Sequence, residues 1–247
     1  MSPPLLSVCI ATMNRWHYLK DALPKYIDNP HIHEIVICDE NGFDALQIKQ
    51  HYGNCGKVRV YINDKKLGAG ANKMRVVSLA SNDWVALLDS DNFADVDYFT
   101  TWQAYIRAHG LDANTVYTPS VCHLKESCAN FDFTKYNDRY VSKDNFQDSY
   151  RDPLWEMVLN NGNFIVNKHK YLHAEPDHPA IREMMGRNSP VEAYLKAGAL
   201  VAHGLKIHVI PDMKWYHGIN KESVFCQNVD IVEEDRRKVW TYFATIK

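Results

Sequence analysis

Short apolar runs alternate with segments of helical periodicity through the first part of the chain. Four runs have the length of strands, and apolar residues three and four positions apart recur between them. This alternation is typical of β-α-β units, and strands that are apolar almost throughout suit a sheet covered on both faces. The predicted strands are 5–11, 33–39, 57–63 and 84–89, and the predicted helices are 15–27, 43–52 and 69–82. We therefore expect an α/β fold with a Rossmann-like, mostly parallel sheet and flanking helices.

The later part of the chain is patterned differently. Residues 130–152 are rich in Tyr, Phe, Asn and Asp without clear periodicity, and we expect a long surface excursion there. A helix over 189–204, a strand over 205–211 and an amphipathic helix over 230–247 are predicted to follow. Because no linker rich in Pro, Gly or Ser divides the chain, residues 1–247 are predicted to form one domain.

Composition narrows the classes of protein to consider. The chain has 247 residues, 46% of them apolar, and a formal charge of −2 without long charge runs, so a nucleic-acid surface is not indicated. No apolar stretch approaches the ~20 residues of a membrane span, and the start of the chain predicts a first strand rather than a signal peptide. Six scattered cysteines suit a reducing compartment, and we expect a cytoplasmic protein. The spacing of Cys122, His123 and Cys128 does not favour a zinc site.

Polar residues stand where the predicted strands end. Thr12, Asn14 and Arg15 follow the first strand, and Asp39 ends the second. Ligands of parallel α/β sheets bind beyond the carboxyl ends of the strands, so these residues are expected to meet in one crevice.

The third predicted helix follows glycines at Gly68 and Gly70, which permit close approach of an anion to its first N–H groups. Lys73 and Arg75 either add positive charge there or form a solvated helix face.

Two carboxylates close the fourth strand. Asp89 and Asp91 are separated by one residue, and both can reach a divalent cation such as Mg²⁺ or Mn²⁺, which often bridges protein carboxylates to phosphates. The D-x-D pattern alone is weak, since it recurs at Asp95 and Asp97, where a helix start explains it. Its position at a strand end in an α/β pattern favours the metal site.

These segments resemble the family 2 glycosyltransferases of the GT-A fold, which use nucleotide-activated sugars. The resemblance is carried by LSVCIATMNRWHYLKDAL, EIVICDENGFD, LGAGANKMRVVSLASNDWVALLDSDN, NNGNFIVNKHKYL and PVEAYLKAGALVAHGLKIHVIPDMKWYHG. It runs from about residue 6 to 217 and is absent between 93 and 160. It implies a donor half over about 1–120, and an acceptor half with a C-terminal helix over about 121–247.

The resemblance also implies roles for single residues. Asp39 would accept a hydrogen bond from the uracil or ribose, Asp89 would approach the ribose or the metal, and His217 would complete the coordination of Mn²⁺ or Mg²⁺. By position, the donor nucleotide is expected at Thr12, Asn14, Arg15, Asp39, Gly68, Lys73, Asp89 and Ser90, and the metal at Asp89, Asp91 and His217.

Glu192 is the expected general base. The family's Arg-Asn reads Lys73-Met74 here, and its Glu-Asp pair reads Glu192-Ala193, so Glu192 must act alone. Another reading makes Glu192 the third residue of a capping box whose N-cap is Ser189.

The implied function is metal-dependent transfer of a sugar from a UDP-sugar to a glycan or other hydroxyl acceptor, with inversion. A retaining GT-A enzyme and a catalytically silent sugar-nucleotide-binding module are the alternatives. Acceptor choice is expected in the region from Phe131 to Trp155, where Trp155 and Tyr150 are candidates for stacking on a sugar.

Overall fold

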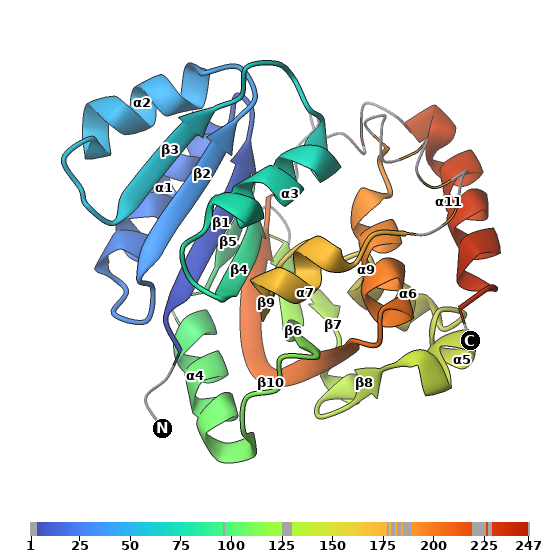
Figure 1. Ribbon diagram of the computed structural model, residues 1–247. Helices are drawn as coiled ribbons and strands as arrows, with labels where there is room; N and C mark the ends of the chain where they lie inside the picture. Colours follow the sequence, from blue (N-terminus) through green and yellow to red (C-terminus); the bar gives the residue numbers. More distant parts are fainter. Residues whose placement is uncertain are drawn as a thin grey trace.

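The computed structural model describes residues 4–95, 97–124, 130–176, 178, 181, 184, 189–218, 226 and 229–246. Ten strands within these ranges form one sheet, which Figure 1 shows crossing the molecule. The order along the sheet is β3-β2-β1-β4-β9-β6-β10-β5, with β7 paired to β6 and β8 to β10.

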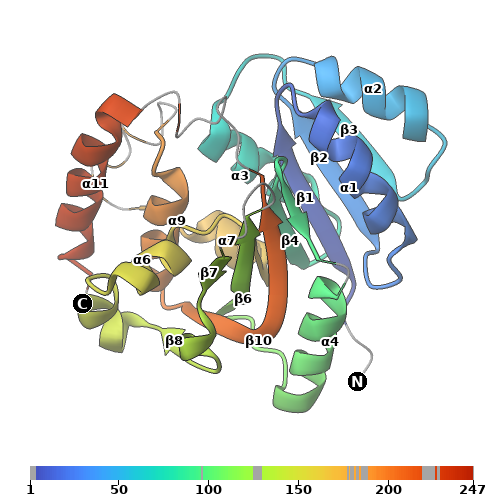
Figure 2. The same ribbon diagram turned by 180° about the vertical axis from the view of Figure 1, so that it is seen from behind.

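The first half of the chain builds the parallel part of the sheet. β1 lies between β2 and β4, and β3 pairs with β2, all in parallel. Helices α1 and α3 cover opposite faces of this part, as the two views in Figures 1 and 2 show. The elements are β1 (Leu6–Thr12), α1 (Trp16–Asp28), β2 (Glu34–Asp39), α2 (Phe43–Tyr52), β3 (Val58–Ile62), α3 (Ala69–Leu79) and β4 (Trp84–Asp89).

The second half extends the sheet with mixed directions. β9 runs antiparallel to β4 and β6, and β10 runs parallel to β6. Strands β4, β6 and β10 therefore end at the same edge as β1 and β2. The elements are β5 (Asn92–Ala94), α4 (Tyr98–His109), β6 (Thr115–Leu124), β7 (Asn130–Asp132), η1 (Thr134–Tyr136), β8 (Tyr140–Val141), η2 (Lys143–Asn145), α5 (Phe146–Ser149), α6 (Pro153–Leu159), β9 (Phe164–Asn167), α7 (Lys168–His173), α9 (Glu192–Ala202), β10 (Lys206–His217) and α11 (Val229–Phe243).

Several predicted boundaries change. β10 continues six residues past Pro211, because a bulge between Ile210 and Lys214 absorbs the proline. Asp212 takes a left-handed backbone with φ of 59° within that bulge. The region 130–152 is not a plain loop, since β7 and β8 hydrogen-bond to the sheet.

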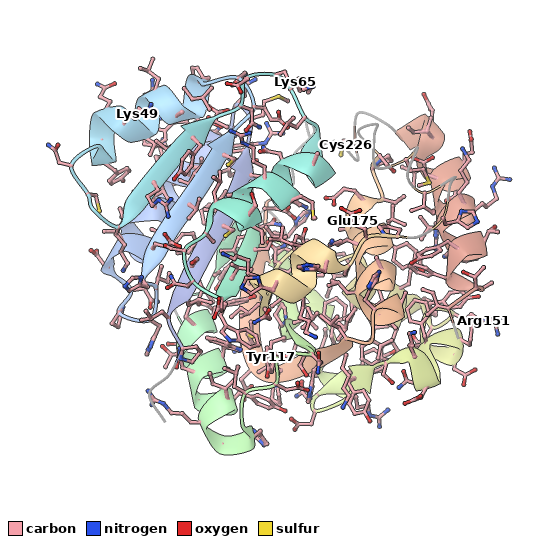
Figure 3. All side chains as sticks on the ribbon, in the orientation of Figure 1. Lys49, Lys65, Tyr117, Arg151, Glu175 and Cys226 are labelled. Atoms are coloured by element: carbon pink, nitrogen blue, oxygen red, sulfur yellow. The ribbon has the colours of Figure 1, made fainter. Side chains whose placement is uncertain are left out.

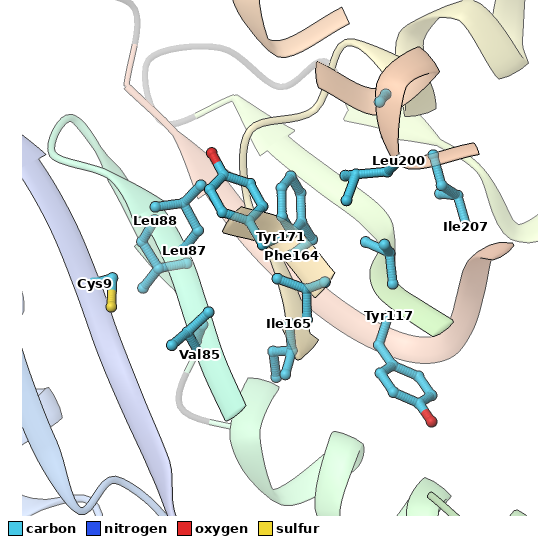
Figure 4. Close-up of a cluster of buried hydrophobic side chains, with 14 of the residues drawn as sticks. Cys9, Val85, Leu87, Leu88, Tyr117, Phe164, Ile165, Tyr171, Leu200 and Ile207 are labelled. Carbon is cyan, nitrogen blue, oxygen red and sulfur yellow. The ribbon is translucent and has the colours of Figure 1, made fainter. Parts of the chain in front are cut away.

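The core lies on both sides of β1, β4 and β9. Figure 4 shows one part of it, where Leu87 of β4 lies in register with Phe164 of β9 and Val85 projects from the same face of the sheet. These side chains are almost fully buried, which explains the continuous apolar runs in the sequence. Within the part of the chain that the structure describes, no helix combines the length and apolar character needed to cross a membrane.

Candidate active site

A cavity of about 550 Å³ opens at the carboxyl ends of the strands. Most of the predicted site residues line it, namely Thr12, Arg15, Gly68, Lys73, Asp89, Ser90, Asp91, Glu192 and His217. A second cavity of about 570 Å³ lies between α4 and β10, but it gathers none of these residues.

The turn after β1 is organised by Asp44, a fully buried carboxylate in the first turn of α2. Its oxygens accept hydrogen bonds from the backbone N–H groups of Arg15 and Trp16, at 2.8–2.9 Å, and from the hydroxyl of Thr12 at 2.6 Å. Asp44 thus caps α1 from another helix. The only sequence signal was an acidic residue early in α2, so Asp44 was missed.

Asp39 does not line the cavity, contrary to prediction. Its carboxylate is fully buried and accepts hydrogen bonds from the N–H groups of Asn41 and Ala45. Burial raises the pKa of Asp39 above its usual value. Asp39 therefore shapes the turn that leads into α2.

The neighbouring Glu40 is the carboxylate of this turn that lines the cavity. Its Oε2 accepts a hydrogen bond from the N–H of Leu67 at 2.7 Å, while its buried Oε1 has no hydrogen-bond partner among the described residues. An orphaned carboxylate oxygen at a cavity wall is suited to an N–H or O–H group of a ligand.

Asn14 also lies outside the cavity lining. It is exposed, has φ of 59°, and its Oδ1 accepts a hydrogen bond from the side chain of Asn41. Asn14 therefore ties together the turns after β1 and β2.

Gly68 has φ of 87° directly before α3, a conformation that favours glycine. It brings the start of α3 to the cavity wall, as predicted.

Lys73 is the electrostatic centre of the site. Its Nζ lies 2.7 Å from Oδ1 of Asp89 and 2.6 Å from Oε1 of Glu192. Burial alone would lower the pKa of Lys73, but the two carboxylates outweigh it and raise that pKa well above the ordinary value. The solvated-face interpretation of Lys73 is wrong, because the helix turns this residue into the protein.

His217 reaches the D-x-D turn through the pairing of β10 with β5. It is in register with Asn92, and its Nδ1 lies 2.8 Å from Oδ1 of Asn92. An amide oxygen only accepts hydrogen bonds, so we assign the proton to Nδ1, which leaves a lone pair on Nε2. Gly218 then donates its N–H to the carbonyl of Asp91 at 3.1 Å. These contacts bring the end of β10 at His217 beside the D-x-D turn at Asp91, although the two residues lie far apart in the sequence.

The three predicted metal ligands do not form a complete coordination site. Within the described ranges, no group of three His, Cys, Asp or Glu side chains is placed to hold a metal ion. Asp89 is ion-paired with Lys73, and Asp89, Asp91 and His217 all line the cavity. One or two protein ligands suffice for Mg²⁺ or Mn²⁺ when phosphates supply the others. The residues therefore fit a metal shared with a diphosphate.

Glu192 is not part of a capping box. Helix α9 begins at Glu192 itself, and the hydroxyl of Ser189 donates to Asp235 of α11 at 2.8 Å. The carboxylate of Glu192 turns toward Lys73 instead.

One turn along α9, the ammonium of Lys196 donates to the carbonyls of Tyr171 and Ala174, each at 2.7 Å. Burial lowers the pKa of Lys196 to about 8. Lys196 thus fixes α9 to the end of α7, and with it the position of Glu192.

The NNGN segment before β9 packs against the D-x-D turn. Asn163 accepts a hydrogen bond from the N–H of Asp89 at 2.9 Å. A Cβ at Gly162 would lie 2.7 Å from Oδ2 of Asp89 and 3.1 Å from Nζ of Lys73. Only glycine lets this segment approach the ion pair so closely.

The two aromatic residues predicted to stack on sugars are packed inside the protein. The ring of Trp155 stacks on Tyr136 with centroids 4.1 Å apart, and Tyr150 packs against Phe146 and Phe243. The aromatic residues of that region that line the cavity are Phe131 and Phe133. Cys226, which also lines it, is labelled in Figure 3. Of the three residues considered for zinc, Cys122 is buried and Cys128 lies outside the described residues.

Residues 7–166 match the sequence profile of glycosyl transferase family 2. The chain belongs to this family. An uncharacterized glycosyltransferase of Methanocaldococcus jannaschii is 29% identical over an alignment 132 residues long, and the match covers 44% of this chain and 45% of that protein. The predicted family membership is confirmed.

Solved structures confirm the GT-A fold. Residues 1–349 of TarS from S. aureus, in complex with UDP-GlcNAc, superpose with a TM-score of 0.72 over 98% of this family 2 chain and 67% of TarS 1–349, at 16% identity. GalNAc-T7 with UDP, GalNAc and Mn²⁺ gives 0.63 over 98% of this chain and 50% of its own, at 14% identity. At these identities the likeness concerns the fold alone.

Proposed function

We propose that this protein transfers a sugar from a UDP-sugar to a hydroxyl acceptor with inversion, and that Glu192 is the general base. One observation carries the proposal: Glu192 and the D-x-D turn line the same cavity and are joined through Lys73. The UDP and UDP-GlcNAc complexes of TarS, a structure of the same fold, agree with a uridine nucleotide as the donor's leaving group.

The nucleotide belongs in the part of the cavity formed by the ends of β1 and β2 and the start of α3. Glu40 offers an unpartnered carboxylate oxygen to a base or ribose, and Arg15 and Lys66 supply positive charge along the wall. Gly68 lets the diphosphate approach the first N–H groups of α3. These residues bind and orient the donor.

The residues of the D-x-D turn would hold the metal. Asp91 and the Nε2 lone pair of His217 are suited to Mn²⁺ or Mg²⁺, with Asn92 fixing the tautomer of the histidine. When bound, the cation neutralises charge on the leaving diphosphate. Mn²⁺ in the GalNAc-T7 structure supports this choice of metal.

Glu192 would accept the proton of the attacking hydroxyl. It stands at the first turn of α9, held by Lys73 and buried except for about a sixth of its side chain (16% exposed). General-base catalysis on one face of the sugar, with the diphosphate leaving from the other, inverts the anomeric carbon. The carboxylate then returns its proton to solvent.

Calorimetry with UDP tests the donor and metal assignments together. We expect UDP to bind more tightly with Mn²⁺ or Mg²⁺ than with EDTA. His217→Ala should lose most of this gain in affinity, because the variant lacks one of the proposed metal ligands. His169→Ala, which removes an exposed histidine of α7 outside the cavity, is the matched control and should keep the wild-type difference between the affinities with metal and with EDTA. Equal affinity for UDP with metal and with EDTA would remove the metal from the proposal, and no binding of UDP would remove the donor.

A further inference from the structure

One wall of the cavity is apolar, and it lies away from the cationic side chains. Trp215 of β10 is in register with Cys122 of β6, and Cys122 is in register with Phe131 of β7. Residues paired directly across strands project from the same face of a sheet, so these three side chains form a row. The row lines the cavity together with Phe133 and Met157.

This apolar row contains one orphaned donor. Trp215 is 7% exposed, and its buried indole N–H has no acceptor among the residues described in the structure. The indole of Trp240 on α11 donates to the hydroxyl of Tyr194 at 3.0 Å, whereas the indole N–H of Trp102, outside the cavity, also has no acceptor among the described residues. A buried N–H without a partner is unfavourable, and an acceptor brought by a ligand would relieve it.

The chemistry of this wall suits a neutral group that has an apolar part and a hydrogen-bond acceptor. Among the residues that the structure describes, the cations lining the cavity are Arg15, Lys66 and Lys73, which belong to the turn after β1, the segment before α3 and α3 itself. An anionic part of a ligand would bind near these cations. The row offers carbon and sulfur surface beside a single N–H, which suits a methyl group next to a carbonyl oxygen. A hydroxyl in the same place would lose hydrogen bonds to water and find only one donor.

We propose that this wall is a subsite for the acetamido group of a 2-acetamido sugar. Trp215 Nε1 donates to the amide carbonyl, and Cys122 and Phe131 contact the methyl group. The inference rests on the proposed function, since it assumes that the cavity holds sugar substrates. The acetamido group belongs either to the transferred sugar of the donor or to the acceptor sugar, and both sources present the same chemistry to the wall.

Binding measurements with matched pairs of sugars separate these sources. Calorimetry with Mn²⁺ compares UDP-N-acetylglucosamine with UDP-glucose, and then N-acetylglucosamine with glucose on the UDP-bound protein. We expect the acetamido member of one pair to bind about tenfold more tightly, the factor given by one hydrogen bond. Trp215→Phe keeps the apolar ring and removes the N–H, so it should reduce that preference to about twofold while the affinity for UDP stays unchanged.

Trp240→Phe is the matched control, because it removes an indole N–H outside the cavity and should leave the preference intact. Phe131→Ala, at a side chain 37% exposed, should weaken the preference without unfolding the protein. The subsite is refuted if UDP binds but neither pair discriminates, or if Trp215→Phe and Phe131→Ala both keep the wild-type preference. Failure of UDP itself to bind refutes instead the function on which the subsite rests.

Discussion

Lys73 replaces the arginine expected at its position in the family, and its contacts suit a lysine. An ammonium is a compact charge with three donors, whereas a guanidinium is a planar fork that favours one bidentate partner. Here the ammonium donates to two carboxylates from different elements, β4 and α9, and the lysine side chain is 9% exposed. A single point charge therefore connects the donor side of the cavity to the proposed base.

Glu192→Gln tests the base with little change of shape. We expect transfer to fall by about 10²–10⁴-fold, because an amide cannot accept the proton, while UDP binds as in the wild type. The measurement is turnover of a labelled UDP-sugar with acceptor, beside calorimetry of UDP.

Glu156→Gln is the control, since Glu156 is likewise only partly exposed and ion-paired, with Arg236, but does not line the cavity. Undiminished transfer by Glu192→Gln would favour a retaining reaction. If the wild type and Glu192→Gln both bind UDP but neither transfers the sugar, a silent binding module would be favoured.

Helix α9 is positioned by its contacts with two other helices. Lys196 holds it to the end of α7, and Gly198 faces the ring of Phe243 on α11. A Cβ at Gly198 would overlap that ring. Since Glu192 begins α9, these distant contacts set where the carboxylate stands.

Gly198→Ala should destabilise the protein by about 1–3 kcal/mol, although alanine is normally the better helix former, because overpacking outweighs propensity. Urea unfolding measures the loss. Adding Phe243→Leu should recover part of it, since the smaller side chain makes room beside the new methyl group. Equal or greater stability of the single variant would mean that α11 shifts easily and does not position α9.

At the amino ends of the parallel strands, away from the cavity, Glu34 at the start of β2 holds neighbouring segments together through hydrogen bonds. Burial disfavours its ionisation, but hydrogen bonds from Ser7, Ser81 and Arg59 outweigh burial and lower the pKa of Glu34 to about 2. A carboxylate with a lowered folded-state pKa stabilises above its unfolded pKa, and this contribution is lost as the pH falls through the folded value.

Glu34→Gln should therefore cost about 1–3 kcal/mol at pH 7, from charged hydrogen bonds replaced by neutral ones. The difference in the free energy of unfolding between this variant and the wild type should shrink as the pH falls from 4.5 to 2. Denaturant unfolding at several pH values measures it. Glu233→Gln, at a side chain 72% exposed, is the control and should change little. A constant difference across that range would mean that Glu34 does not ionise differently in the two states.

Across the chain, the parallel strands and the crevice could be predicted because buried strands and their polar ends leave a direct trace in sequence. The finer choices depend on tertiary packing. Asp39 and Glu40 are neighbours of the same charge, and only the direction of the turn decides which one lines the cavity. Trp155 and Tyr150 have the composition of a sugar platform, yet they pack inward. Neither distinction has a signature in composition or spacing.

Residues 93–160 carry no motif that resembles the family, although the family profile spans them. β6 pairs with β7 and with β10, which lies far along the chain, so no local period reveals this part of the sheet. Phe131 and Phe133 reach the cavity through this pairing. The region predicted for acceptor choice does contribute to the cavity, through residues other than the two singled out.

The ammonium of Lys73, which Asp89 and Glu192 share, has a consequence for the order in which substrates bind. While Lys73 holds Glu192, the base is engaged, and the diphosphate of an arriving donor competes for the same charge. Substrates should therefore add in order, donor first and acceptor second. Labelling of carboxylates with a carbodiimide and an amine, followed by mass spectrometry, should modify Glu192 severalfold faster once UDP and Mn²⁺ are present. Glu156, which is similarly exposed and ion-paired, should be labelled at the same rate with and without UDP and Mn²⁺. Slower labelling of Glu192 in their presence would mean that UDP shields this carboxylate, and would contradict the ordered addition.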